Sequence, residues 1–395
     1  MKSFNSILQT QKRLISSARL CILLVSLILL ICACAPALPG TPTPQNPATQ
    51  PSVVATKIPA GFTIGFIYTG WKGDWGSTQA AHIGSLALAD AFSGSIDILE
   101  KQNTPPGAAG QAMEKLIGEG ARVIFSTDPK DEDITLQLAG RHPEVTFLQL
   151  DGTKLAPNLG TISGSIWQAV YLSGVAAGKM TKNNRLGYVA ARTRPTMLLD
   201  INAFTLGVRS VNSAATVRVV FTESGCNSHE QQEAAFTLLD MGTDVVAQDQ
   251  DCTQTIIEMC ERNAVMSVGY NVDGATLAPT HWITGAVWNW GPLYTRIVTA
   301  LQAGQWEAGP YNGRYRAGLK EGLVDLASFG TAVPVDVQTL VLARKQAIIN
   351  GTFDPFEGPV KDQDGLVRIP AGIRPAIEDL EHINYLVEGV IGNLP

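Results

Sequence analysis

The chain has 395 residues, of which 45% are hydrophobic and 16% charged, and its formal net charge at pH 7 is −6. This length allows two domains of ordinary size, and the composition is that of a globular α/β protein rather than a disordered or fibrous one. The negative charge argues against a nucleic-acid-binding surface, which requires a basic footprint, so nucleic acid is not an expected partner.

Residues 1–33 are predicted to be the signal peptide of a lipoprotein. Four basic residues precede an apolar run, 20–34, which is shorter than the roughly 20 residues of a comfortable membrane span and suits the core of an export signal. The run ends in Ile31-Cys32-Ala33-Cys34, which resembles a bacterial lipobox, so Cys34 is the candidate lipidation site. More than one acyl chain there would anchor the protein stably to the extracytoplasmic face of a bacterial cell membrane. The alternative is a signal anchor that is not cleaved.

Residues 34–60 are rich in Pro, Thr and Ala and contain one charged residue, Lys57. This composition favours an extended tether between the lipid anchor and a globular body.

From residue 62 onward, short β-rich segments alternate with segments of helical periodicity. Continuous apolar strands separated by helices indicate parallel sheets that are covered by helices on both faces. The expected strands are 62–69, 95–100, 121–127, 145–151, 185–191, 216–222, 244–250, 265–271 and 282–288.

The strands fall into two series, which predict two doubly wound lobes with a cleft between them. Lobe 1 is expected over 61–178, with part of 275–310 returning to it. Lobe 2 is expected over 179–274, with most of 311–395 returning to it and to the hinge. Parallel α/β sheets bind ligands outside the carboxyl ends of their strands, so the strand-end loops should line the cleft.

Asp, Asn and Trp recur in these loops. Each Asp or Asn has an alternative role as a helix cap. The first loop, Gly70–Ser77, is as glycine-rich as a phosphate-binding loop, but its two tryptophans and Asp74 suit a flat, hydrogen-bonding ring better. The loops are 69–77, 126–133, 150–158, 223–230, 248–252, 270–274 and 287–292.

Signals of catalysis are lacking in the sequence. There is no HExxH, no GxSxG and no GxGxxG after a strand, and the run 174–181 has the wrong glycine spacing for a Walker A loop. It is better explained as a helix that packs through small residues. The sequence therefore predicts no enzyme, no cofactor and no metal site.

Three cysteines belong to the expected globular body. Cys252 and Cys260 lie eight residues apart on a predicted helix, about 12 Å, which is too far for a disulfide. Cys226 and Cys252 each follow a predicted strand and could meet at one sheet edge. Either this pair forms a disulfide or the thiols are buried and free.

Segments along the whole body resemble the basic membrane lipoprotein (BMP) family of substrate-binding proteins of ABC transporters. The resemblance runs from about residue 62 to 393, and it is strongest at 156–191, 201–212, 286–294 and 358–372. It implies a type I periplasmic-binding-protein fold, in which two α/β lobes are joined by three crossovers and close on the ligand through a hinge. Many members of the family bind purine nucleosides, and some bind nucleobases or riboflavin, with the base between aromatic rings and its edge bonded to an Asp and an Asn.

In lobe 1 the resemblance assigns Asp74 to the family's loop aspartate. Ser77 replaces the family's aromatic residue, and Trp71 or Trp75 could supply the lost ring. Trp167 occupies a position that is often Tyr or Glu. From its loop alone, Asp128 is a further candidate for ligand contact.

In lobe 2 the resemblance assigns Asp251 and Asp273 to two loop aspartates, and Trp288 lies in an intact motif. Asn227 stands where the family has Asp, and Gly225 where it has Trp. We interpret Trp290 as a packing residue. The lost family residues weaken the case for a ribose subsite, so a flat heterocycle is expected without a required sugar.

The sequence thus implies a monomeric, lipid-anchored, extracytoplasmic receptor that binds a purine nucleoside, nucleobase or similar heterocycle and delivers it to an ABC permease. Two alternatives of the same fold are a sugar receptor and a sensor that presents its ligand to a signalling protein. An enzyme is a third.

Overall fold

The computed structural model describes residues 62–191 and 194–394. The expected signal peptide, Cys34 and the tether lie outside these residues. Within the described ranges, none of the helices combines the length and the apolar character that crossing a bilayer requires.

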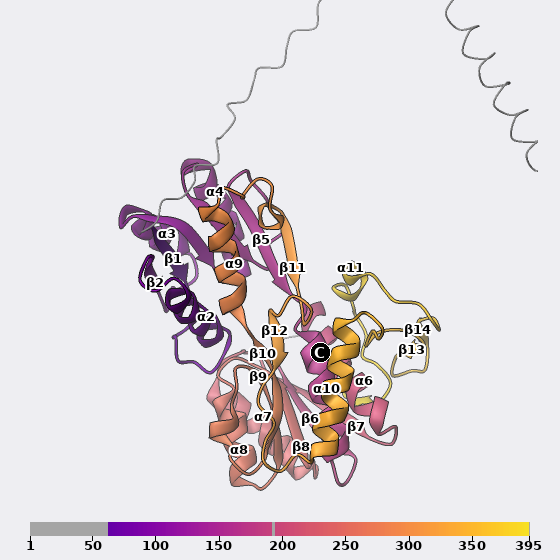
Figure 1. Cartoon of the computed structure of the whole chain (residues 1–395). Coiled ribbons are helices and arrows are strands. Elements are labelled where there is room, and N and C mark those ends of the chain that lie inside the picture. The colour runs from indigo at the N-terminus through magenta and orange to yellow at the C-terminus, as the bar shows by residue number, and fades with distance from the viewer. Residues whose placement is uncertain (1–61, 192–193, 395) are drawn as a thin grey trace, which may run out of the picture. The chain divides into compact units, whose positions relative to one another are not determined.

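The first sheet has six strands, in the order β11-β5-β4-β3-β1-β2, and all neighbours are parallel. Its central strands are buried apolar runs, as the sequence predicted, because helices cover both faces. Helices α3 (Ala109–Gly118) and α4 (Glu132–Arg141) cover one face, and α2 (Ser77–Ala91) and α9 (Trp290–Gln302) cover the other (Figure 1). The strands are β1 (Thr63–Ile67), β2 (Asp97–Lys101), β3 (Ala121–Ser126), β4 (Thr146–Leu150), β5 (Leu159–Gly164) and β11 (Arg314–Ala317).

The second sheet has seven strands, in the order β12-β10-β9-β8-β6-β7-β15, and only β12 runs antiparallel to its neighbour. Helices α5 (Trp167–Met180), α6 (Pro195–Val211) and α10 (Val335–Ile349) lie on one face, and α7 (Ser228–Asp240) and α8 (Gln254–Arg262) on the other. The strands are β6 (Arg185–Ala190), β7 (Thr216–Phe221), β8 (Val245–Asp249), β9 (Met266–Asn271), β10 (Trp282–Trp288), β12 (Val324–Leu326) and β15 (Val390–Ile391).

The chain crosses between the two sheets three times. It enters the second sheet after β5, returns to the first through α9 and β11, and enters the second again at β12. All nine strands expected from the sequence are present. β11 lies within the range that we assigned mostly to lobe 2, yet it pairs with β5 of the first sheet. The remaining short elements are η1 (Pro129–Asp131), η2 (Ala275–Leu277), η3 (Pro310–Asn312), β13 (Val360–Lys361), β14 (Val367–Ile369) and α11 (Ile377–Leu380).

Helices α5 and α6 pack with their backbones nearly in contact. A Cβ atom at Gly174 would lie 2.2 Å from the carbonyl oxygen of Phe204, and one at Gly207 would lie 2.1 Å from that of Tyr171. Only glycine permits this approach. The run 174–181 is therefore a small-residue helix contact, as the sequence indicated, and not a phosphate loop.

Candidate functional site

A cavity of about 80 Å³ lies at the carboxyl ends of the first sheet's strands and is closed by two tryptophans. Small-molecule sites usually measure roughly 300–1,000 Å³, so this cavity would have to widen to hold a ligand. Its lining residues are Thr69, Ser77, Thr78, Ala81, Thr127, Leu150, Asp151, Gly164, Trp288 and Trp290.

The tryptophan wall is a stack of rings at the end of β10. The rings of Trp288 and Trp290 are stacked, with centroids 5.1 Å apart, and Trp290 stacks in turn on Tyr294 at 5.5 Å. The edge of Trp288 meets Gly164, where a Cβ atom would lie 2.1 Å from the ring. Trp290 therefore covers one face of the Trp288 indole, and only the other face is available to a ligand ring.

The carboxylate of Asp151 is the one charged group that lines the cavity, and it accepts no hydrogen bond from the residues that the structure describes. Its residue follows β4 in the left-handed conformation, with φ of 49°. Desolvation by the surrounding protein raises the pKa of Asp151 to about 6, and Arg316 partly offsets this rise. The side chain still faces open space, so a ligand can reach it.

The threonines differ in how far their hydroxyls are engaged. Thr127 donates its hydroxyl hydrogen to the carbonyl of Ile67 at 2.8 Å, and Thr78 bonds to Asp74. The hydroxyl of Thr69 has no partner among the described residues. Among the described residues, the groups left to meet a ligand are therefore the Asp151 carboxylate, the hydroxyls of Thr69 and Ser77, and one indole face.

A chain of hydrogen bonds joins the two lobes beside this cavity. Asp251 Oδ1 accepts from the backbone N–H of Ser77 at 2.8 Å and from Asn271 Nδ2 at 3.3 Å. Asn271 Oδ1 in turn accepts from Trp288 Nε1 at 3.0 Å. We call Ser77, Asp251, Asn271 and Trp288 the interlobe network, because it ties the start of α2 in lobe 1 to the tryptophan wall through lobe 2.

The architecture and the site agree with a known family. The sequence profile of the family described as ABC transporter substrate-binding protein PnrA-like (Bmp) matches residues 62–353. The chain belongs to the Bmp family. Its members are solute-binding proteins rather than enzymes, and they work outside the cytoplasm.

Two relatives have names that state a ligand of their own. A purine-binding protein of Brucella abortus is 32% identical over 84% of this chain and 93% of its own length. A putative ABC transporter glucose-binding protein of Haloferax volcanii is 28% identical over 84% of this chain and 80% of its own. Among solved structures, an ABC transporter solute-binding protein from Conexibacter woesei covers 74% of this chain and 98% of its own, with a TM-score of 0.65 and 20% identity, which supports the type I periplasmic-binding-protein fold.

Most of the ligand-binding residues that we predicted in the first loop of the Bmp protein do not line the cavity. Asp74 Oδ1 accepts from the backbone N–H groups of Gly76 and Gln79, at 2.8 and 3.0 Å, and so caps α2. Desolvation raises its pKa. The Trp71 side chain is 60% exposed, and the Trp75 carbonyl accepts from Thr253 Oγ1 at 2.7 Å. Of the first-loop residues that we predicted, only Ser77 lines the cavity.

Four further predicted residues also lie away from the cavity lining. Asp128 caps η1, Asn227 caps α7, and Asp273 accepts from the N–H groups of Ala275 and Ser328. Asp128 and Asn227 thus have the capping role that the sequence analysis gave as the alternative to ligand contact. Trp167 is buried, edge-on to Phe356 at 5.5 Å.

A disulfide supports the lobe 2 side of the interlobe network. Cys226 and Cys252 are bonded, with Cα atoms 5.2 Å apart. Because Cys252 follows Asp251 directly, the bond restrains the loop that presents this carboxylate. Cys260 is a buried free thiol, and burial raises its pKa to about 12.

Lobe 2 also holds a buried acidic pair near its strand ends. The carboxyl groups of Asp200 and Asp249 bond to each other, and Tyr270 Oη donates to Asp200 at 2.9 Å. Desolvation raises the pKa of both aspartates, that of Asp200 to about 7. One of the two must carry the shared proton, so the pair adds less negative charge to the cleft than two aspartates would.

Sequence reasoning missed Thr69, Asp151 and Trp290 as cavity residues. The first two lie in strand-end loops that the pattern singled out, so the loops were identified but not the side chains within them. No group of three or more His, Cys, Asp or Glu residues in the described ranges is arranged to hold a metal ion.

Proposed function

We propose that this Bmp protein binds a purine, as the free base or the nucleoside, between the open face of Trp288 and the carboxylate of Asp151. The observation that supports this best is a carboxylate without a hydrogen-bond donor among the described residues, in a cavity that also contains a tryptophan face. A purine offers a flat ring to stack and edge N–H groups to donate. The purine-binding relative from Brucella abortus points to the same ligand class.

The energies suffice for a transport receptor. Stacking a base on an aromatic ring contributes about 1–3 kcal/mol, and hydrogen bonds to a charged group contribute about 1.5–3 kcal/mol each. A micromolar dissociation constant requires about 8 kcal/mol in total. One stack, two bonds to Asp151, a bond to Thr69 and burial of the rings can reach this value.

The charge of the cavity lining also suggests which purine derivatives the site would exclude. Among the residues that the structure describes, the lining has no Lys or Arg, and its one charged side chain is that of Asp151. A nucleotide phosphate beside this lining would be repelled by the Asp151 carboxylate, and the nearby Arg316 is already the counter-charge of that carboxylate. We expect bases and nucleosides to bind and the corresponding monophosphates to bind far more weakly.

A thermal-shift and calorimetric screen of adenine, guanosine, AMP, riboflavin and glucose tests this proposal. A ligand at 100 times its dissociation constant should stabilise the folded protein by about 2.7 kcal/mol. Stabilisation by glucose alone would favour the sugar alternative, which the putative glucose-binding relative supports because tryptophan also stacks on sugar rings. Turnover of a nucleoside would contradict the receptor proposal.

We further propose that the protein is held outside the membrane by lipid on Cys34, and that it delivers its ligand as a monomer to the permease of an ABC importer. The lipobox-like run that ends at Cys34 and the tether that follows it support this proposal. Replacing Cys34→Ser should release the protein from membranes in cell fractionation. Retention of the variant in the membrane fraction would favour the uncleaved anchor.

A further inference from the structure

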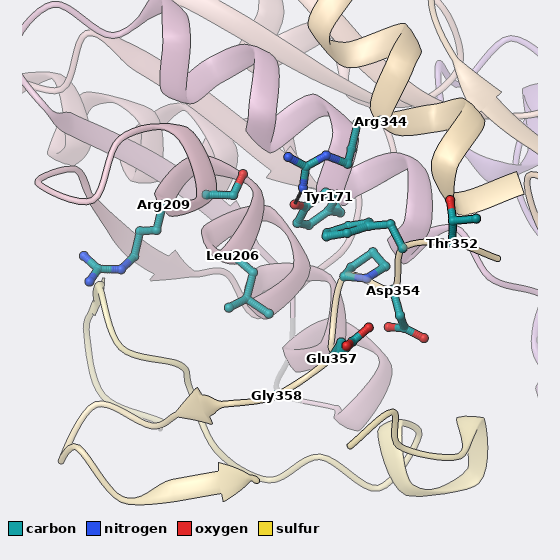
Figure 2. Close-up of a pocket in the computed structure, with 11 residues that line it drawn as sticks. Tyr171, Leu206, Arg209, Arg344, Thr352, Asp354, Glu357 and Gly358 are labelled. Atoms are coloured by element: carbon teal, nitrogen blue, oxygen red, sulfur yellow. Dashed lines mark hydrogen bonds between the residues drawn. The ribbon is translucent and has the colours of Figure 1, made fainter. Parts of the chain in front are cut away.

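A second and larger cavity lies away from the purine site. It measures about 550 Å³, within the usual range of small-molecule sites, and shares no lining residue with the first. Helices α5, α6 and α10 and the loop 352–358 form it (Figure 2). Its lining residues are Tyr171, Leu206, Arg209, Ser210, Arg344, Thr352, Phe353, Asp354, Pro355, Glu357 and Gly358.

Arg344 is held rigidly at this cavity. Its guanidinium carbon lies 4.3 Å from the centroid of the Phe353 ring, and Nη1 donates to Tyr171 Oη at 2.9 Å. Tyr171 is itself buried, so packing holds its side chain in place. The ring and the phenol together fix the plane of the guanidinium, and a fixed donor loses little entropy when it binds.

The charge of Arg344 is not matched by a carboxylate among the described residues. An arginine offers five N–H donors, and one of those of Arg344 has a partner among the residues that the structure describes. The other charged groups at the cavity are engaged: Arg209 binds Glu388 and two carbonyls, Glu357 pairs with Arg374 at 2.8 Å, and Asp354 accepts from a backbone N–H at 2.8 Å. In Figure 2 Arg209 points away from the other labelled side chains, whereas Arg344 lies beside Tyr171.

The rest of the lining sets the size and charge of a partner for Arg344. Leu206, Phe353 and Pro355 offer apolar surface to a ring. Asp354 and Glu357 border the same cavity, so the charge of Arg344 can offset one negative charge on a ligand but not two. An anion with a single charge and a flat apolar body satisfies both conditions.

We propose that this cavity is a second binding site, which takes a small aromatic monocarboxylate with its carboxylate on Arg344 and its ring against Phe353. Planar, bidentate binding of a carboxylate is the interaction that the guanidinium fork favours. The proposal does not depend on what the first cavity binds.

The test is ¹⁹F NMR titration of 4-fluorobenzoate with the full-length chain, with 4-fluorobenzamide as the uncharged analogue. We expect saturable binding of the benzoate. The amide should bind at least about tenfold more weakly, because its hydrogen bonds to Arg344 no longer involve a charged carboxylate. Saturating adenine should leave benzoate binding unchanged. Equal affinities for the two probes, displacement by adenine, or no saturation at about 10 mM benzoate would each overturn the proposal.

Two substitutions locate the site. Arg344→Gln should weaken benzoate binding about tenfold or more. The matched control is Arg262→Gln, which removes one positive charge from an exposed position on α8 and should change nothing. If Arg344→Gln does not fold, as judged by its melting curve, Arg344→Lys replaces it and should bind the benzoate more weakly than the unaltered chain. Full affinity in the folded variant would contradict the assignment.

Discussion

At the scale of single residues, Trp288 is the side chain on which the purine site depends most. Replacing Trp288→Ala should lower purine affinity by the loss of one stack, about 1–3 kcal/mol, or roughly 5- to 150-fold. Isothermal titration calorimetry with the purine found in the screen measures this effect. Trp71→Ala is the matched control, because its side chain is 60% exposed and lies outside the cavity lining. Equal losses in both variants would remove Trp288 from the site.

Asp151 should make binding depend on pH. Its raised pKa, about 6, means that the free protein takes up a proton at this carboxyl as the pH falls through 6. The ionised form accepts the ligand's N–H groups with both oxygens and its full charge, whereas the protonated form accepts more weakly, so affinity should be constant well above pH 6 and fall by up to tenfold per pH unit below it. Calorimetry with a purine that does not titrate in this range measures the profile.

The variant Asp151→Asn separates this effect from general acid instability. It should bind more weakly at pH 7 and show no pH dependence around pH 6. A pH dependence that survives in Asp151→Asn would show that another group is responsible. Asp128→Asn, on a neighbouring loop outside the lining, should behave like the unaltered chain.

The choice of residues within each loop could not be read from the sequence. Asp74, Asp128 and Asn227 cap helices, and an aspartate that caps looks the same in a sequence as one that binds a ligand. Asp151 lines the cavity with its backbone in the left-handed region, and no pattern in the sequence predicted this backbone conformation. Spacing along the chain also gave no sign that Trp290 would stack on Trp288.

At the scale of elements, the contact between α5 and α6 is the feature most sensitive to added volume. Gly174→Ala would place a methyl group 2.2 Å from the Phe204 carbonyl oxygen, so the helices must separate, at a cost of about 1–3 kcal/mol in the free energy of unfolding. Denaturant unfolding measures this loss. Gly118→Ala is the control, since nothing lies within 4 Å of the added atom, and its stability should be unchanged or slightly raised. Equal stability of both variants would contradict the close approach.

The elements themselves were largely predictable. Nine strands stood out because they are apolar and flanked by turn residues. β5 was missed because its sequence, LGTISG, is made mostly of small residues, and β11 and β12 because four and three residues are too short for a periodic signal. The return of β11 to the first sheet is a tertiary contact, and local pattern does not encode it.

At the scale of the whole molecule, we expect closure of the two lobes to depend on the interlobe network. Asp251→Ala removes the acceptor of both Ser77 and Asn271, so the closed form should be less populated and purine affinity should fall, although Asp251 is outside the cavity lining. Small-angle scattering should show a larger radius of gyration for the variant at saturating purine. Asp128→Ala, which removes a cap within lobe 1, is the control. If Asp251→Ala leaves both the radius of gyration and the purine affinity unchanged, the network does not stabilise the closed form.

The thiols of the molecule have a practical consequence. Cys226 and Cys252 are bonded to each other, and Cys260 is buried with a raised pKa, so the described ranges offer no reactive sulfur. A cysteine introduced at the exposed position of Trp71 would be the sole labelling point of this part of the chain. A dye attached there would lie on the loop that meets lobe 2, and its emission should change as the lobes close. The fold is thus suited to a reagentless fluorescent reporter of its own ligand.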